Sequence, residues 1–318
     1  MIKKLFATAL MTFSAAAFAV PFGSQSVLVV EDGTGKVLIE KNADQVVPIA
    51  SLTKLMTAMV VLDAKLDMDE QIEIDRSDVD TVKYSSSRVP VGASISRRDV
   101  LHLALMSSDN RAAAALARTY PGGKEGFKAA VRRKIHALGM TQTSIEEPTG
   151  LSPHNRSTAT DLVKMATAST RYPEIVRMTT ETRDIIDING RGVEYRNTNR
   201  LVGAKGWDVG LSKTGFTNEA GRCLIMNIKA AGKNATLVLL NAGASSARIM
   251  DALNIRRFIT GDEPVARVAR AATGGPRIKA SAGRSKAKAS ARAKSGAKAK
   301  AVSKRKQAKV KTARKRRD

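Results

Sequence analysis

The spacing of apolar residues changes twice along this chain, from alternation to helical periodicity and back. Two β-branched apolar runs, residues 26–30 and 36–40, flank Asp32-Gly33-Thr34-Gly35, and this arrangement predicts a β-hairpin. Helical spacing of apolar residues predicts helices over residues 51–62, 97–106, 110–119, 124–138, 159–170 and 245–258. Strand-like runs return at residues 182–188 and 193–197, joined through Asn189-Gly190, and at residues 223–229 and 236–241. Strands at both ends with helices between them predict an α/β (α+β) fold, an antiparallel sheet flanked by helices with an inserted all-α subdomain.

The positive charge of the chain is concentrated at one end. The 318 residues carry a formal net charge of +25, yet residues 275–318 hold 18 of the 54 lysines and arginines and a single acid, Asp318. This segment repeats Ala, Lys, Arg and Ser without an aromatic residue or leucine, so it cannot bury enough apolar surface to fold. Residues 263–318 are therefore predicted to be a disordered tail. The 43% of apolar residues excludes disorder of the whole chain and leaves residues 20–262 as one folded domain.

The first residues have the order of a secretory signal peptide. Lys3 and Lys4 precede an apolar run, residues 5–13, and small residues follow up to Ala17-Phe18-Ala19, after which cleavage is expected. The apolar run is short for a membrane-spanning helix, which needs about 20 residues. We therefore expect residues 1–19 to be removed and the mature protein to be periplasmic, either soluble or peripheral on an envelope surface. A single cysteine, Cys223, is compatible with that compartment and excludes an intramolecular disulfide framework.

Export also changes the partner expected for the basic tail. Dense lysine and arginine attract polyanions, and composition by itself favours nucleic acid. Outside the cytoplasm the available polyanions are anionic lipid head groups, lipopolysaccharide phosphates and cell-wall carboxylates, so a nucleic-acid partner is not expected. The tail either binds such anionic envelope components or is a solvated segment without a specific partner.

Three short motifs carry the candidate chemistry, and each also has a purely structural interpretation. Ser51-Leu52-Thr53-Lys54 places a hydroxyl and an amine on one side of a predicted helix start, where a serine is also a favoured N-cap. Ser108-Asp109-Asn110 lies between two predicted helices and is equally suited to capping the second. Lys213-Thr214-Gly215 precedes the predicted strand that starts at Cys223 and fits an exposed turn.

Taken together, the ordered motifs Ser-x-x-Lys, Ser-x-Asn and Lys-Thr-Gly resemble those of active-site serine penicillin-binding enzymes and class A β-lactamases. The segments 48–57, 147–159 and 213–223 resemble more closely the low-molecular-mass penicillin-binding proteins of the D-alanyl-D-alanine endopeptidase and carboxypeptidase family, serine peptidase family S11. The resemblance covers about residues 25–260 and not the tail. It implies a β-lactamase/transpeptidase-like fold and a serine hydrolase that acts on peptidoglycan stem peptides, with β-lactams as covalent inhibitors.

Within that family, carboxypeptidases usually carry a further β-rich domain and an amphipathic anchor, and no such segment is recognised after about Thr260. The chain therefore resembles the endopeptidase branch, which cuts D-alanyl-diaminopimelate cross-links during cell-wall remodelling. The first alternative is a carboxypeptidase that trims the terminal D-alanine of stem peptides. The second is a β-lactamase, although Glu146 and Glu147 do not match the glutamate that class A enzymes use for deacylation. An alternative of another class is a polyanion-binding envelope or nucleic-acid protein that acts through its tail.

The resemblance implies a catalytic role for each of three residues. Ser51 would attack the carbonyl group of a D-alanine residue and form an acyl-enzyme that water hydrolyses. Lys54 would accept the Ser51 proton, which requires a neutral amine, and the nearby positive charge of Lys213 would help to keep it neutral. Ser108 would relay a proton to the leaving amine.

Six positions are expected to contribute to substrate binding. Asn110 would orient the substrate amide and Lys54, while Lys213 and Thr214 would hold the substrate carboxylate or backbone. The main-chain N–H groups of Ser51 and Phe216 would form the oxyanion hole. Gly215 would leave room for the substrate backbone, which a side chain would block.

No metal or cofactor is expected. The three histidines, His102, His136 and His154, have no ligand or triad motif around them. His102 lies among leucines and is predicted to be a packed helix residue. Cys223 is predicted to be an inert thiol on a buried strand.

Overall fold

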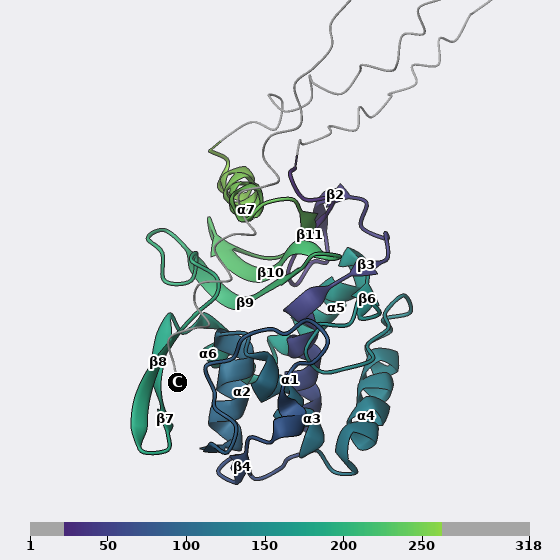
Figure 1. The fold of residues 1–318 in the computed structure, drawn as a ribbon. Helices are drawn as coiled ribbons and strands as arrows, with labels where there is room; N and C mark the ends of the chain where they lie inside the picture. Colours follow the sequence, from purple (N-terminus) through teal and green to yellow (C-terminus); the bar gives the residue numbers. More distant parts are fainter. Residues whose placement is uncertain (1–21, 263–318) are drawn as a thin grey trace, which may run out of the picture. The chain divides into compact units, whose positions relative to one another are not determined.

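The computed structural model describes residues 22–262. The expected signal peptide, residues 1–19, and the predicted tail, residues 263–318, lie outside the described residues. A five-stranded antiparallel sheet has the strand order β2-β1-β11-β10-β9 (Figure 1). Its strands are β1 Ser26–Glu31, β2 Val37–Lys41, β9 Asp208–Thr217, β10 Gly221–Ala230 and β11 Lys233–Ala242. The predicted hairpin of β1 and β2 is confirmed, and β1 also pairs with β11, from the other end of the sequence.

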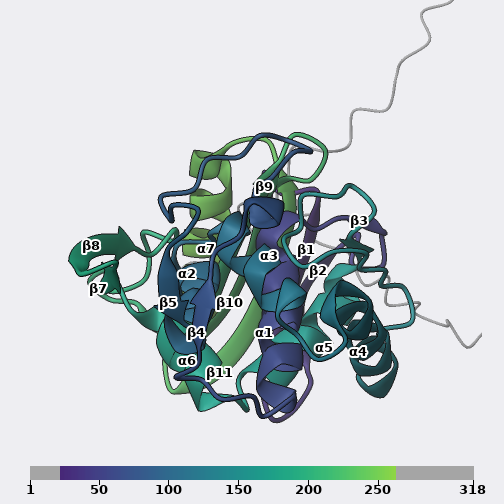
Figure 2. The same ribbon diagram turned by 60° about the horizontal axis from the view of Figure 1, so that its bottom comes forward.

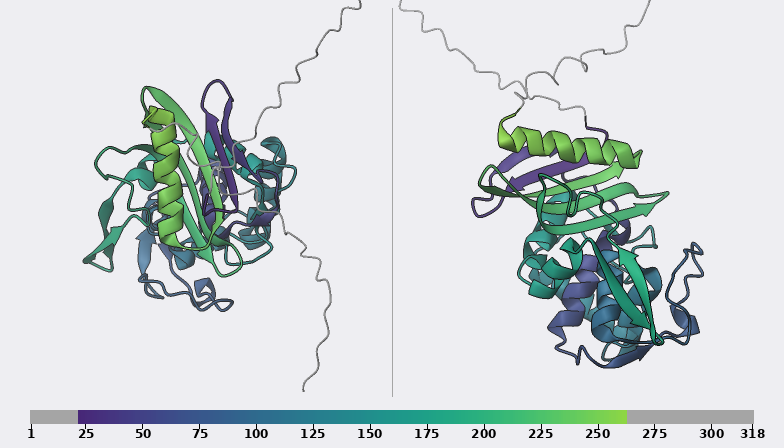
Figure 3. Two further views of the ribbon diagram at one scale, coloured as in Figure 1. Left: turned by 90° about the horizontal axis from the view of Figure 1, so that it is seen from above. Right: turned by 90° about the vertical axis from the view of Figure 1, so that its left-hand side faces the viewer.

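Both faces of the inner strands are buried, which explains why β1, β10 and β11 are nearly continuous apolar runs. On one face Val27 and Leu239 pack against helix α7, Ser245–Thr260, through Ile255. On the opposite face Leu28 and Val238 join the core of the helical part. Figure 3 shows α7 lying alone on its face, with the other helices beyond the opposite face.

The helical part is built around α1. The helices of this part are η1 Ala50–Leu52, α1 Thr53–Asp63, η2 Arg76–Asp78, α2 Arg97–Met106, α3 Asn110–Arg118, α4 Gly123–Ala137, α5 Ala159–Ser169 and α6 Pro173–Thr180. Residues 53–61 of α1 are all buried, because α2, α3, α4 and α5 surround it (Figure 2). A helix that is apolar on all sides is expected at such a central position.

Small two-stranded sheets interrupt the helical part, so the prediction that it is all-α was wrong. They pair β3 Val47–Pro48 with β6 Arg156–Ser157, β4 Gln71–Glu73 with β5 Ser94–Ser96, and β7 Arg183–Ile188 with β8 Arg191–Arg196. Runs of two or three residues are too short to show a period in the sequence. The hairpin of β7 and β8 was predicted, and Asn189 and Gly190 both have positive φ, as a type I′ turn requires.

Two elements escaped prediction because they lack an apolar pattern of their own. Strand β9 contains glycines, a serine and a lysine, but it pairs with β10 along its length, with Lys213 opposite Ile225. The exposed-turn interpretation of Lys213-Thr214-Gly215 was therefore wrong, since these residues are buried within a strand. Helix α6 begins at Pro173, whose fixed φ suits the first helical position.

The overall class of fold was predicted correctly: an antiparallel sheet flanked by helices, with a helical block inserted between its second and third strands in the sequence.

A buried carboxylate joins the two ends of the described chain through hydrogen bonds. Asp251 of α7 accepts hydrogen bonds from the backbone N–H groups of Gly23 and Ser24, at 3.0 and 2.7 Å. Within residues 22–262, no helix has the length and apolar character needed to span a membrane.

Candidate active site

The three sequence motifs meet where the helical part borders strand β9. Ser51 lies in η1, and Lys54 follows in the first turn of α1, so that Lys54 Nζ donates to Ser51 Oγ over 3.1 Å. The N-cap of α1 is Leu52 and makes no side-chain capping bond, so the capping interpretation of Ser51 was wrong. Ala50 has a φ of +47°, a strained conformation for a residue with a side chain, directly before the serine.

The Lys54 amine is fully buried and is held by acceptors from three separate segments. Besides Ser51, it donates to Asn110 Oδ1 at 2.6 Å and to the Thr149 carbonyl oxygen at 2.7 Å. Burial lowers the pKa of Lys54 to about 8, against the opposing charges of Glu147 and Asp109. The expected cause was the charge of Lys213, but removal from water is the dominant one.

A second buried amine faces Ser108. Lys213 Nζ donates to Ser108 Oγ at 2.8 Å and to the Thr214 carbonyl oxygen at 3.1 Å. Burial, together with the charges of Lys54 and Arg248, holds the pKa of Lys213 well below its ordinary value. Ser108 reaches this position by a left-handed backbone conformation, φ +61°, in the short link between α2 and α3. The geometry thus places two hydroxyls, each against its own buried amine.

The motif Ser108-Asp109-Asn110 combines capping with site geometry. Asp109 caps α3 by accepting from the Ala112 N–H at 2.9 Å, so capping was the right interpretation for this residue. Asn110 bonds Lys54 through its oxygen and donates to Ser85 Oγ through its amide nitrogen at 2.8 Å. Ser85 was not predicted as a site residue, because its loop carries no motif.

One carboxylate shapes the loop that supplies the Thr149 carbonyl group. Glu147 accepts from the Thr149 and Gly150 N–H groups, both at 2.7 Å, and from Asn155 Nδ2 at 2.9 Å. It also accepts from the Thr149 hydroxyl at 2.5 Å. Its oxygens are thereby engaged by the loop, which does not suit Glu147 to activate a water molecule as class A β-lactamases require. Backbone acceptors such as Thr149 have no sequence signature.

Strand β9 approaches the nucleophile closely at Gly215. A Cβ atom on Gly215 would come within 3.1 Å of both the Ser51 nitrogen and the Ile49 oxygen. Glycine at this position favours the close contact between β9 and residues 49–51, and its role in leaving room for the substrate backbone stays a prediction. Thr214 Oγ1 lies 2.6 Å from Thr198 Oγ1, and the Phe216 ring is half exposed beside the Arg222 guanidinium.

A cluster of titratable side chains and a single thiol lie apart from this centre. Among residues 22–262, His102, Glu181 and Asp184 bring ligand-type atoms within 4.8 Å of one another. Glu181 faces the Nε2 atom of His102 at 2.7 Å and Asp184 faces its Nδ1 atom at 3.3 Å. Because the two ring nitrogens point in different directions, each carboxylate faces a different nitrogen and the three residues do not converge on one metal site. His102 is buried on α2, as predicted for a packed residue. Cys223 is also buried, and burial raises its pKa to about 11.

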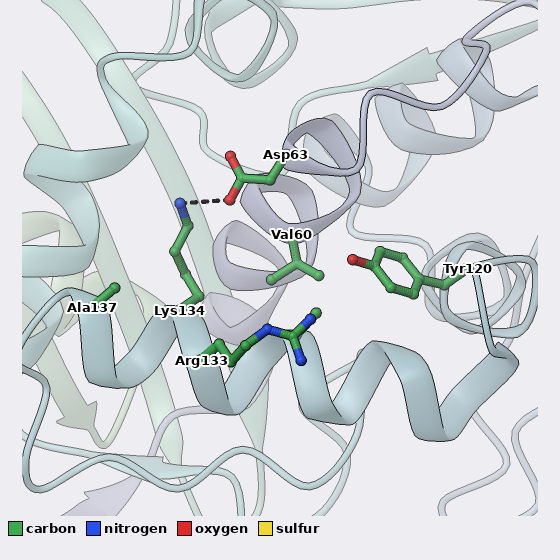
Figure 4. Close-up of a pocket in the computed structure, with 7 residues that line it drawn as sticks. Val60, Asp63, Tyr120, Arg133, Lys134 and Ala137 are labelled. Carbon is green, nitrogen blue, oxygen red and sulfur yellow. Dashed lines mark ion pairs between the residues drawn. The ribbon is translucent and has the colours of Figure 1, made fainter.

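A pocket of about 320 Å³ lies between α1 and α4 (Figure 4). Its lining includes Val60, Tyr120 and Arg133, and Lys134 pairs with Asp63 across it at 2.6 Å. Asp63 is nine residues beyond Lys54, about 14 Å along the helix at 1.5 Å per residue. The pocket is therefore separate from the site at Ser51.

Comparison with known proteins places this site in a family. The model of the peptidase S11 family, described as D-alanyl-D-alanine carboxypeptidase, matches residues 12–244. The chain belongs to this family. The peptidase is 50% identical to the D-alanyl-D-alanine endopeptidase of Pseudomonas aeruginosa and 46% identical to that of Escherichia coli. Each match covers 74% of this chain and 77% of the relative.

A solved structure supports the fold. The ampicillin-bound penicillin-binding protein D2 of Listeria monocytogenes matches with a TM-score of 0.65 and 30% identity, over 76% of this peptidase and 98% of that chain. The expected β-lactamase/transpeptidase-like fold and the serine hydrolase class are thus confirmed.

Replacing Gly150 by alanine is expected to lower the free energy of unfolding by more than about 2 kcal/mol. The φ of Gly150 is +88°, and an added Cβ would lie 2.0 Å from the Ala50 oxygen. Gly232→Ala is the matched control, because its φ is +75° and no atom lies within 4 Å of the added Cβ. This control substitution should lower the free energy of unfolding by about 1 kcal/mol. Urea unfolding measures both, and equal losses would contradict the close packing of Gly150 on Ala50.

Proposed function

We propose that this peptidase is a D-alanyl-D-alanine endopeptidase that hydrolyses D-alanyl-diaminopimelate cross-links of peptidoglycan through an acyl-enzyme on Ser51. The observation that carries the proposal is the contact between Ser51 Oγ and the buried amine of Lys54. The names of the relatives at 50% and 46% identity support the endopeptidase branch. The family description leaves carboxypeptidase activity as the alternative.

In the acylation step, Ser51 Oγ attacks the carbonyl carbon of the D-alanine and its proton passes to Lys54. A pKa of about 8 leaves part of the Lys54 population neutral near pH 7, which this transfer requires. The leaving amine needs a proton, and Ser108, hydrogen-bonded to Lys213, is placed to relay it. Water then hydrolyses the ester, with the same buried amine available as the base.

Substrate binding in this proposal uses strand β9. Within the described residues β9 lies at the edge of the sheet, so its outer edge can pair with an extended peptide. Lys213 and Thr214 would hold the carboxylate next to the scissile bond, and the N–H groups of Ser51 and Phe216 would stabilise the oxyanion. The stem peptides of peptidoglycan are the substrates, β-lactams acylate Ser51 as covalent inhibitors, and the mechanism needs no metal or cofactor.

Ser51→Ala should reduce the cleavage of a cross-linked muropeptide dimer by at least about 1,000-fold, because no other hydroxyl contacts Lys54 among the described residues. Mass spectrometry of the products measures this loss. Ser107→Ala is the control, since the Ser107 hydroxyl bonds back to the Leu103 carbonyl group instead. Wild-type protein that releases only terminal D-alanine, with no monomers, would establish the carboxypeptidase alternative. Undiminished cleavage by the Ser51 variant would refute the mechanism.

Penicillin acylation should speed up as the pH rises toward 8 and level off above it. Protonated Lys54 cannot accept the Ser51 proton, so the rate should fall about tenfold per pH unit well below the pKa. Because the charge of Glu147 raises the pKa of Lys54, Glu147→Gln should move the midpoint to lower pH. Stopped-flow acylation from pH 5.5 to 9.5 tests both statements. A flat profile, or a shift to higher pH in the variant, would be inconsistent with Lys54 as the base.

We further propose that residues 1–19 direct export to the periplasm and that the basic tail, residues 275–318, binds anionic envelope surfaces. Protein recovered from a periplasmic fraction should begin at Val20 by intact-mass analysis. Deleting the tail should abolish salt-sensitive sedimentation with isolated sacculi or anionic vesicles and leave the cleavage of soluble muropeptides unchanged. Retained sedimentation without the tail would exclude it as the tether.

A further inference from the structure

An ion pair joins the helical part to the strand that carries Lys213. Lys83 Nζ lies 2.5 Å from Glu219 Oε1. Lys83 belongs to the loop between η2 and β5, and Glu219 to the turn between β9 and β10. The two side chains remain 26% and 41% exposed, so a ligand can still reach both charges. A pair this exposed contributes less than about 1 kcal/mol to stability. The stability of the fold therefore does not by itself account for these two opposite charges.

The loop that carries Lys83 is fixed relative to the catalytic centre. The Asp80 carboxylate accepts from the N–H groups of Val82, Lys83 and Ser85, at 2.8, 3.0 and 2.8 Å. Ser85 Oγ in turn accepts from Asn110, whose oxygen bonds Lys54. One network of side-chain contacts therefore sets the position of Lys83 relative to Ser51.

The same loop presents an aromatic ring to solvent. Tyr84, between Lys83 and Ser85, has a φ of +54° and is 83% exposed. Phe216 of β9, three residues before Glu219 in the chain, is a second large apolar residue with an exposed side chain, 51% exposed. Exposed aromatic side chains close in sequence to the two charged residues offer apolar surface that suits a ligand with an aliphatic chain and charged ends.

The direction of β9 indicates which part of the substrate would lie here, and this step rests on the proposed function. If Lys213 and Thr214 hold the leaving residue and the scissile carbonyl faces Phe216, the preceding substrate residue lies beyond Phe216, toward Glu219. Successive residues of an extended peptide are about 3.3 Å apart, so the backbone of this residue would lie one step beyond Phe216 and its long side chain would span the remaining way to Glu219. In the proposed substrate that residue is diaminopimelate.

We propose that Lys83, Tyr84 and Glu219 form the subsite for the diaminopimelate residue that precedes the scissile D-alanine. The side chain of this residue ends in one carboxylate and one ammonium group when it is not itself cross-linked. Lys83 pairs with the carboxylate and Glu219 with the ammonium, while the aliphatic chain lies against the Tyr84 ring. A lysine at the same position of the peptide has the ammonium but not the carboxylate, so the subsite distinguishes the two residues.

The test measures how peptides slow penicillin acylation of the full-length protein, a readout that does not depend on turnover. The probes are two peptides that differ in one residue, ending in diaminopimelyl-D-alanyl-D-alanine or in lysyl-D-alanyl-D-alanine. Wild-type protein should prefer the diaminopimelyl peptide by up to about fivefold, the effect of one exposed ion pair. Lys83→Met should remove this preference and leave the acylation rate without peptide unchanged.

Two further variants separate recognition from structure. Exchanging the charges, Lys83→Glu with Glu219→Lys, keeps an ion pair at the same place but should still lose the preference. Arg98→Met is the matched control, because Arg98 pairs with Asp69 at an exposed position in another part of the helical region, and it should keep the preference. Equal inhibition by the two peptides in wild type, or a preference retained in Lys83→Met, would overturn the subsite.

Cleavage of the cross-linked dimer, measured in parallel on the wild type, tests the proposed function separately. Wild-type protein that prefers the diaminopimelyl peptide but does not cleave the dimer would leave the subsite standing and refute the endopeptidase activity. Cleavage of the dimer without any preference between the peptides would support the endopeptidase activity and refute the subsite.

Discussion

The architecture of this peptidase depends on keeping the Lys54 amine out of water. An isolated ammonium group is costly to bury, and the fold meets that cost with acceptors from η1, from α3 and from the loop after Glu147. These three segments are distant in the sequence, so the helical part must be assembled before the amine is correctly enclosed. The same burial that requires the acceptors also lowers the pKa of Lys54 toward neutrality. One physical constraint therefore sets both the local packing and the reactivity of Ser51.

Unusual backbone conformations and closely packed glycines position the residues around Ser51. Ala50 and Ser108 adopt left-handed conformations that side chains disfavour, and each places a reactive segment next to a buried lysine. Gly150 and Gly215 let two chain segments approach residues 49–51 more closely than any other residue would allow. The serine is thus enclosed by backbone on two sides, and its position does not depend on a helix cap.

The sequence predicts the parts of this protein that have a repeating pattern or a recognisable motif. Helix α2 was placed at its observed bounds from the spacing of its apolar residues, and in the structure Ser96 caps its start. Strand β9 was missed because its residues, Lys213 among them, serve the site and not the core pattern, and its pairing with β10 is a tertiary contact. The motif residues were found, and the structure brings Ser51, Lys54, Ser108, Asn110 and Lys213 together. The Thr149 carbonyl group, Ser85 and the carboxylate of Glu147 hold these residues in place, and their roles arise only from long-range packing.

The pairing of β1 with β11 inside the sheet has a consequence for how the chain folds. Ser26 pairs with Leu240, so the first strand cannot acquire its neighbour β11 until more than two hundred further residues have been synthesised. Asp251 adds a second late contact, because its partners are Gly23 and Ser24. Contacts of such long sequence separation slow folding, since the entropy of closing a large loop must be lost before they form. Strands β9, β10 and β11 follow one another with short turns, so within the described sheet the long-range closure is confined to the contact between β1 and β11.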